Sequence, residues 1–245
     1  MRTIVAACIL CLPFRLHAQS VTSIEPSARV LPSNTLRFYI TFNRPARGMV
    51  HQSAIKLFDS KHRPVENAFM DFGQELWSPD GKRLTVLFDP GKIKRGVEAP
   101  HTELSPLKED ESYRIAFGKA QHAFRVGPAI REPIDPSSWV ISVVRAPART
   151  VDITFDRVMD AALLMDQLQV EDEDGRPILG AVRVIGGGCG VRFKPSRLLE
   201  RGKYRIRVGP LLEDVAGNRI NEALDHSINE KPRESSGWAT TFVLR

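Results

Sequence analysis

ITFNRPARGMVHQSAIKLFDSKHRPV (residues 40–65) and ITFDRVMDAALLMDQLQVEDEDGRPI (residues 153–178) are two copies of one pattern. They align without a gap at an offset of 113 residues, and both begin with Ile-Thr-Phe and end with Arg-Pro and an aliphatic residue. Further on, VLFDP from Val86 matches VRFKP from Val191 at an offset of 105, and YRIAFG from Tyr113 matches YRIRVG from Tyr204 at an offset of 91. A constant order with shrinking offsets indicates one unit present twice, with extra residues in the first copy. Repeats at this spacing are duplicated domains rather than solenoid turns.

Each copy has the alternation of β-strands. Leu36, Phe38, Ile40 and Phe42 alternate with more polar neighbours, which is the period of a strand with one buried face, and the second copy repeats this pattern from Val151. Further strands are expected at residues 55–57, 84–88, 113–117, 168–170, 191–193 and 204–208. The turn sequences SPDGK, DEDGRP and DVAGN separate them. Short strands with frequent turns predict an all-β chain of two β-sandwiches, and VMDAALLMDQLQV predicts one helical turn before the strand at Leu168.

The N-terminus has the features of a secretory signal. Arg2 supplies the positive start, TIVAACILCLPF is an apolar core, and LHA ends in a small residue, which predicts cleavage after Ala18. A lipoprotein with Cys8 as its first residue is the alternative, although almost no apolar core precedes that cysteine. No later segment approaches the twenty apolar residues of a membrane span. We therefore expect an exported protein, periplasmic or secreted.

These patterns divide the chain into four parts. Residues 1–18 are the expected signal peptide, 19–130 the first sandwich, 131–137 (REPIDPS) a proline-rich linker, and 138–245 the second sandwich. Removing Arg2 and Arg15 lowers Lys+Arg from 35 to 33 against 29 acidic residues, so the mature net charge is near +4. This mild, scattered charge is compatible with anionic envelope surfaces and indicates solubility first.

The second copy resembles a known family. ITFDRVMD, LQVEDEDGRPI and LERGKYRIRVGPLLEDVAGNRI are similar to the bacterial Ig-like domains first named from S-layer proteins, and the likeness covers essentially residues 138–245. The first copy shares the early strands and the Tyr-Arg-Ile strand but lacks the Asp-x-Ala-Gly-Asn motif. The resemblance implies two tandem Ig-like sandwiches in an envelope or secreted protein, usually structural or adhesive. It implies no single function, because the fold is a scaffold.

The extra residues of the first copy mark the expected site. GKIKRGVEAPHTELSPLKEDESY, from Gly91, stands where the second copy has only SRLLERGKY, so 105 − 91 = 14 residues are inserted before the Tyr-Arg-Ile strand. Long insertions at one turn of a scaffold often acquire binding roles. Lys92, Lys94, Arg95 and His101 on this loop could bind a carboxylate, phosphate or sulfate. The alternative is a solvated loop with ordinary surface charge.

Metal and cofactor motifs are absent from the sequence. The mature histidines His51, His62, His101, His122 and His226 lack HxH, HExxH or other paired spacing. The first residues are similar to periplasmic copper-resistance sandwich proteins, but cleavage after Ala18 would remove His17, and a later ligand histidine has no counterpart. Asp172, Asp174 and Asp214 could serve calcium, but they are better explained as turn formers. We predict no metal and no cofactor.

Enzyme and nucleic-acid motifs are also missing. There is no GxSxG, Walker loop or CxxC, and GGGCG at residues 186–190 predicts a turn or bulge between strands. Carboxylates such as Glu75, Asp80 and Asp89 are not paired by any motif. Cys189, the one cysteine of the mature chain, is expected to be a small buried or half-buried residue, with a reactive thiol as the alternative. Trp77, Trp139 and Trp238 are too dispersed for a stacking platform and indicate core or domain-seam packing.

Together these features predict a non-enzymatic exported protein that is a binding or structural module of the cell envelope. The expected partner is an envelope protein or an anionic glycan, with no nucleic acid. The alternatives are spacer domains without a ligand, an enzyme that acts on glycans, or a copper-binding periplasmic protein. An enzyme would need a pocket where two carboxylates converge.

Overall fold

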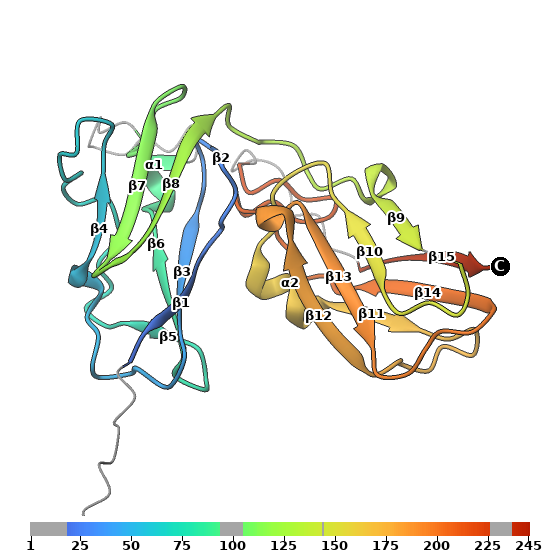
Figure 1. The fold of residues 1–245 in the computed structure, drawn as a ribbon. Coiled ribbons are helices and arrows are strands. Elements are labelled where there is room, and N and C mark those ends of the chain that lie inside the picture. The colour runs from blue at the N-terminus through green and yellow to red at the C-terminus, as the bar shows by residue number, and fades with distance from the viewer. Residues whose placement is uncertain (1–18, 94–104, 144, 226–236) are drawn as a thin grey trace, which may run out of the picture.

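The computed structural model describes residues 19–93, 105–143, 145–225 and 237–245, and the expected signal peptide lies outside them. The chain is all-β, with four sheets that form two β-sandwiches side by side (Figure 1). In the first sandwich, one sheet has the order β1 (Val21–Glu25), β3 (Arg37–Phe42), β6 (Arg83–Leu87) and β5 (Leu76–Trp77). The other has the order β2 (Val30–Pro32), β8 (Ala120–Gly127), β7 (Ser112–Phe117) and β4 (Ile55–Phe58).

The second sandwich repeats this arrangement. One sheet has the order β12 (Gly180–Ile185), β13 (Gly190–Pro195), β10 (Val151–Thr154) and β9 (Val140–Val143), and the other the order β11 (Leu168–Glu171), β14 (Gly202–Val208) and β15 (Trp238–Leu244). Read from β9, the first of these sheets has the strand order of the β1–β3–β6–β5 sheet, and β11–β14–β15 follows β4–β7–β8. The shared topology agrees with a duplicated unit. Among the described residues, the short β2, which pairs in parallel with β8, has no counterpart in the second sandwich.

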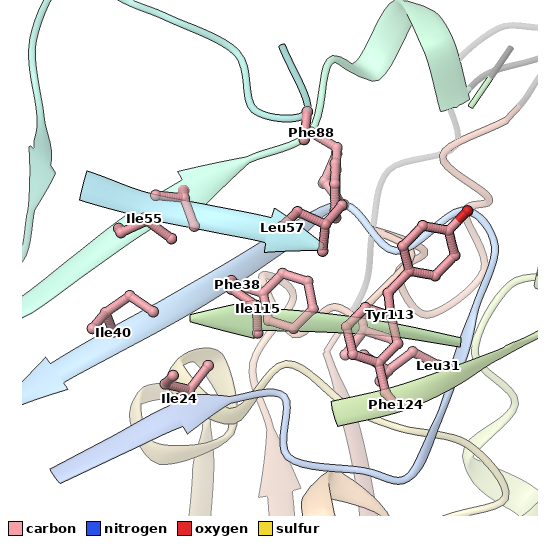
Figure 2. Packing of buried hydrophobic residues seen from close by; sticks show 14 of the residues in the cluster. Ile24, Leu31, Phe38, Ile40, Ile55, Leu57, Phe88, Tyr113, Ile115 and Phe124 are labelled. Atoms are coloured by element: carbon pink, nitrogen blue, oxygen red, sulfur yellow. The ribbon is translucent and has the colours of Figure 1, made fainter. Parts of the chain in front are cut away.

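Hydrophobic side chains from facing sheets fill each sandwich. Figure 2 shows Phe38 and Ile40 of β3 opposite Ile115 of β7 and Phe124 of β8, with Phe88 at one end of the layer. Phe38 lies 6.0 Å from Phe88 and 5.5 Å from Phe124 between ring centroids. In the second sandwich, Trp139 packs edge-to-face on Phe155 and on Trp238. The structure thus confirms that Trp139 and Trp238 are packing residues, and Trp77 likewise packs half-buried against the first core.

The aspartate that precedes Arg-Pro in both copies of the repeat, Asp59 and Asp172, holds a turn in each sandwich. Asp59 Oδ1 accepts hydrogen bonds from the backbone N–H groups of Lys61 and Arg63, both at 2.9 Å. Asp172, 113 residues later, accepts from Asp174 at 3.0 Å and Arg176 at 2.9 Å. These are Asx-type turns, in which the aspartate supplies an acceptor that the turning backbone lacks. The expectation that Asp172 is a turn former is confirmed.

All eight strands expected from alternation are present within one or two residues of their predicted bounds. The expected helical turn is the seven-residue helix α2 (Ala161–Gln167), which Asp160 caps by accepting from the N–H groups of Ala162 and Leu163. Shorter or more polar strands were not predicted: β1, β2, β5, β8, β9, β12 and β15.

The bounds of the two domains remain a prediction, but the expected linker is not a free tether. Ile134 is buried in the second core and its N–H donates to the carbonyl of Arg219 at 3.0 Å. Pro136 is buried in the short helix η2 (Pro136–Ser138), which Asp135 caps. Although the segment is mostly polar and rich in proline, the buried side chain of Ile134 holds it against the second sandwich.

Candidate functional site

The predicted ligand loop is only partly within the described residues. Lys92 lies on the four-residue helix α1 (Pro90–Ile93) that follows β6, and its N–H donates to the carbonyl of Asp89 at 3.0 Å. Its side chain is half-buried. Lys94, Arg95 and His101 lie outside the described residues, so the cluster remains a prediction.

The first sandwich has a groove of about 480 Å³ beside β4. We call it the His51 groove. One wall comes from the 3-10 helix η1 (Gln52–Ala54) and β4, and the other from residues 64–75. Its polar lining residues are His51, Gln52, Ser53, Lys56, Glu66, Asn67, Asp71, Gln74 and Glu75. A second hollow of about 580 Å³ shares Gln74 and Glu75 and extends to Trp77 and Arg83.

Carboxylates dominate the charge of the His51 groove. Glu66, Asp71 and Glu75 outnumber Lys56, and His51 Nδ1 lies 3.0 Å from Glu75 Oε1. The hydrogen bond from His51 lowers the pKa of Glu75 below its ordinary value. A carboxylic acid that catalyses glycan cleavage needs a raised pKa, which Glu75 does not have. Because carboxylates outnumber cations in its lining, the groove suits hydroxyl-bearing or cationic groups better than an anion. Sequence reasoning missed it because its two walls, residues 51–57 and 64–75, share no motif and meet only in the fold.

A buried polar cluster joins the two sandwiches, and we call it the seam cluster: Glu25, Arg37, Tyr39, Arg83, Asp160 and Glu213. The hydroxyl of Tyr39 donates to Asp160 Oδ2 at 2.7 Å, and Arg37 Nε lies 3.1 Å from the same oxygen. Arg37 also pairs with Glu213. The Arg83 guanidinium lies over the Tyr39 ring, 5.3 Å from its centroid. These contacts bind β3 of the first sheet to Asp160 at the start of α2 and to Glu213, and Arg83 of β6 packs on Tyr39.

Burial sets the electrostatics of the seam cluster. It raises the pKa of Asp160 and of Glu25, while Arg37 and the α2 backbone donors pull that of Asp160 down and Arg83 pulls that of Glu25 down. Burial, together with the nearby charge of Asp160, raises the pKa of Tyr39 far above its ordinary value. Tyr39 is thus a hydrogen-bond donor at every physiological pH. Its hydroxyl satisfies one lone pair of the Asp160 carboxylate, which is buried away from solvent.

This shift predicts how stability depends on alkaline pH. Above about pH 10, the unfolded chain ionises Tyr39 while the folded chain keeps its proton, so the unfolded state binds fewer protons and stability falls as pH rises. The ionisation of Tyr39 should lower the free energy of unfolding of the wild type by up to about 1.4 kcal/mol per pH unit. The free energy of unfolding of Tyr39→Phe should fall less steeply with pH. Urea denaturation at several pH values between about 9 and 11 measures both slopes.

Tyr204→Phe is the matched control for that experiment. The Tyr204 hydroxyl donates to the carbonyl of Glu200 at 2.9 Å, and burial raises its pKa too, but its side chain is only half-buried and lies away from the seam. The slope should change less in this variant than in Tyr39→Phe. Equal slopes in wild type and Tyr39→Phe would contradict the burial of an un-ionised tyrosine at the seam.

The DVAGN motif forms a turn whose aspartate is completely buried. Asp214 Oδ1 accepts from the N–H groups of Ala216 and Asn218, both at 2.9 Å, and Oδ2 accepts from the Asn218 amide at 2.9 Å. Gly217 has φ +81°, which favours glycine. Asp214 is therefore a turn former, as predicted. The turn also reaches the first sandwich, because the N–H of Leu36 donates to the carbonyl of Val215 at 2.7 Å.

GGGCG also lies on the seam. It forms the turn between β12 and β13 through the 3-10 helix η3 (Gly186–Gly188), as predicted. A Cβ on Gly187 would lie 2.7 Å from the Cα of Ala28, so only glycine fits here against the first sandwich. Cys189 is half-buried against the first core, and burial raises the pKa of its thiol. A raised pKa disfavours the thiolate, which agrees with the expected half-buried packing residue.

Across residues 19–93, 105–143, 145–225 and 237–245, no group of three or more His, Cys, Asp or Glu side chains has the arrangement of a metal site. Over the same part of the chain, none of the helices has the length and apolar character of a membrane span.

Comparison with known proteins yields only distant likenesses. No protein-family model matches the chain, and no protein of the curated set matches its sequence. The chain is similar to the Group B Streptococcus pullulanase SAP, with 9% identity over 78% of this chain and 22% of that one, at a TM-score of 0.26. It is also similar to native α2-macroglobulin from Escherichia coli spanning domains MG0-NIE-MG1, with 10% identity over 93% of this chain and 72% of that one, at a TM-score of 0.27.

A third structure is the surface layer protein SbsC, domains 4–9, with 12% identity over 83% of this chain and 30% of that one, at a TM-score of 0.24. The chain thus spans well under two thirds of the pullulanase and surface layer chains. At TM-scores this low, nothing about the arrangement or the activity of this chain rests on these likenesses. The β-sandwich assignment rests on its own strand order and cores.

Proposed function

We propose that this chain is an exported, non-enzymatic module of the cell envelope, in which two Ig-like sandwiches are held in one fixed orientation. Its role is structural, or it binds an envelope protein or an anionic glycan. The observation that carries the proposal is the seam cluster. Buried polar groups are stable only when their partners are in place, so a seam built from Arg37, Tyr39 and Asp160 favours one geometry over others. A structural or binding module requires a fixed orientation of its domains, whereas a flexible string of spacer domains does not.

Two further features support the non-enzymatic part of the proposal. The pKa of Glu75 in the His51 groove is lowered, whereas an acid catalyst at neutral pH needs a raised value. The half-buried thiol of Cys189 has a raised pKa, whereas a nucleophilic cysteine needs a lowered one. The sequence motifs of residues 138–245 that resemble bacterial Ig-like domains support the envelope assignment, as does the expected signal peptide.

The inserted loop provides the first test of binding. Lys92, Lys94 and Arg95 changed together to alanine should weaken association with a partner identified by co-purification from native envelope, by roughly tenfold if each cation contributes a surface ion pair. The thermal midpoint should stay at the wild-type value. Affinity for the identified partner, measured with purified components, checks the prediction.

The control removes three cations elsewhere on the same sandwich: Lys61, Lys82 and Lys119, all exposed, changed to alanine. Both variants lose three positive charges, so a loss of affinity in both to the same extent would mean that net charge acts rather than the loop. No saturable partner for the wild-type protein would favour the spacer alternative.

A further inference from the structure

The second sandwich has a row of cations on the outer face of the β11–β14–β15 sheet. Along β14, Tyr204, Ile206 and Val208 point into the core, so Lys203, Arg205 and Arg207 point outward. Alternate residues of a strand are about 6.6 Å apart, which sets the spacing of the three charges. We call these three residues the β14 row.

The neighbouring strands leave the charge of the β14 row largely uncompensated. On β15, Val243, Thr241 and Ala239 lie opposite the three cations, so that side offers a shelf of small uncharged groups. On β11, Glu171 is the carboxylate of this face, and it is 3.8 Å from Arg205 and 3.4 Å from Arg207. Glu171 is buried beneath the two guanidiniums, which remain 46% and 60% exposed. The three cations of the row thus face one carboxylate on the described strands of this sheet, which leaves the face with a net positive charge.

The acidic hairpin next to the row does not neutralise it either. Asp172 uses one oxygen to hold its own turn, and Asp174 pairs with Arg176 at 2.9 Å. Glu173 is exposed in the turn that follows β11.

On the opposite outer face of this sandwich, one arginine has a carboxylate of its own. Arg192 of β13 donates from Nε and Nη2 to the two oxygens of Asp152 of β10, at 2.8 and 2.6 Å, although its side chain is 50% exposed. The pKa of Asp152 is lowered by that bond. On the β14 row, one carboxylate serves two arginines at longer distances, and donors of both guanidiniums face solvent.

We infer that the β14 row binds a linear polysaccharide that carries carboxylate groups, laid along the strand. This inference rests on the proposed function and names the surface and the chemistry of its glycan partner. Guanidinium groups donate paired hydrogen bonds to carboxylates, and the flat shelf of Ala239, Thr241 and Val243 accommodates a sugar backbone beside the charges. Aromatic side chains that would stack nucleic-acid bases are absent from the described strands of this face, which disfavours single-stranded nucleic acid.

The test uses the full chain and polygalacturonate at low ionic strength. Lys203→Gln/Arg207→Gln keeps Arg205 as the partner of Glu171, so no buried carboxylate is left alone. We expect this variant to bind polygalacturonate about tenfold more weakly than wild type. The matched control is Arg183→Gln/Lys194→Gln, which removes two exposed cations from the opposite outer face and should change affinity less than about twofold. Thermal midpoints of all variants verify that they are folded.

A gain-of-affinity variant gives an independent readout. Glu171→Gln frees both arginines from their carboxylate and should tighten binding by a fewfold, whereas a purely structural glutamate would give no gain. Equal losses in the two double variants, or no binding by wild type, would overturn the inference. Stronger retention on anionic phospholipid vesicles than on polygalacturonate, with the same dependence on Lys203 and Arg207, would also overturn it in favour of a membrane. If only the inference fails, a partner captured from native envelope remains sensitive to the loop variant and insensitive to the β14 row.

Discussion

Asp160→Ala is expected to lower the free energy of unfolding by about 3–5 kcal/mol, because it leaves one partner of a buried ion pair without the other. Asp160 is nearly inaccessible, and its carboxylate accepts from Tyr39, from Ala162 and from Leu163, with Arg37 at 3.1 Å. Alanine removes all four interactions. Arg37 would keep only Glu213, and α2 would lose its N-cap. Urea or guanidinium denaturation measures the change.

Two variants show which interaction matters. Asp160→Asn keeps the N-cap, since asparagine caps as well as aspartate, but removes the charge, so its loss isolates the ion pair from the cap. Asp152→Ala breaks the exposed pair with Arg192 on the outer face and should cost about 1 kcal/mol or less. If Asp160→Ala costs no more than Asp152→Ala, the seam cluster does not hold the sandwiches together. A change from one unfolding transition to two would show that the sandwiches unfold separately once the seam is weakened.

Gly187→Ala is the second large effect, and we expect a loss of about 2–5 kcal/mol. The backbone of Gly187 has φ +70°, which costs any L-residue with a side chain. The added Cβ would also lie 2.7 Å from the Cα and 2.8 Å from the N of Ala28, so the clash is with backbone of the other sandwich and no side chain can rotate away. Denaturation gives the stability, and small-angle scattering gives the radius of gyration, which should rise if the sandwiches separate.

Gly73→Ala separates the two causes. Gly73 has φ +68°, nearly the same as Gly187, but nothing lies within 4 Å of its Cβ position. It should therefore cost only the backbone strain of about 1–2 kcal/mol and leave the radius of gyration unchanged. Equal losses of unfolding free energy at both positions would mean that the contact between Gly187 and Ala28 adjusts to a methyl group, and that the two sandwiches are not tightly packed there.

Much of the fold could be predicted from the sequence because its signals are local. Period-two alternation marked the strands that contribute large apolar residues, such as β3 and β13. Asp172 and Asp214 marked turns because an aspartate two residues before a turning N–H is a short-range interaction. Strands such as β8 and β15 were missed because alanine, glutamine and threonine dilute their alternation, although their inward residues Phe124 and Phe242 are buried.

The candidate sites were less predictable. The sequence located an insertion but could not bring residues together, and three of the four residues chosen there lie outside the described ranges. The His51 groove combines residues 51–57 with 64–75, and the β14 row depends on which strands flank β14. Only strand pairing fixes that Val243, Thr241 and Ala239 lie opposite its cations on the β15 side and that Glu171 lies opposite Arg205 on the β11 side.

By itself, the sequence determined the repeated unit, the strand faces and the turns, because each depends on residues close together along the chain. Tertiary structure decided what covers each face. Alternation puts Arg37 and Tyr39 on the outer side of β3, yet Tyr39 is 6% exposed, because the second sandwich covers it through Asp160, 121 residues away. In the same way Gly187 is a turn glycine by sequence and a contact glycine only because Ala28 lies against it. Strand periodicity assigns a side chain to a face, but the burial and the charge environment of that face come from packing between distant segments.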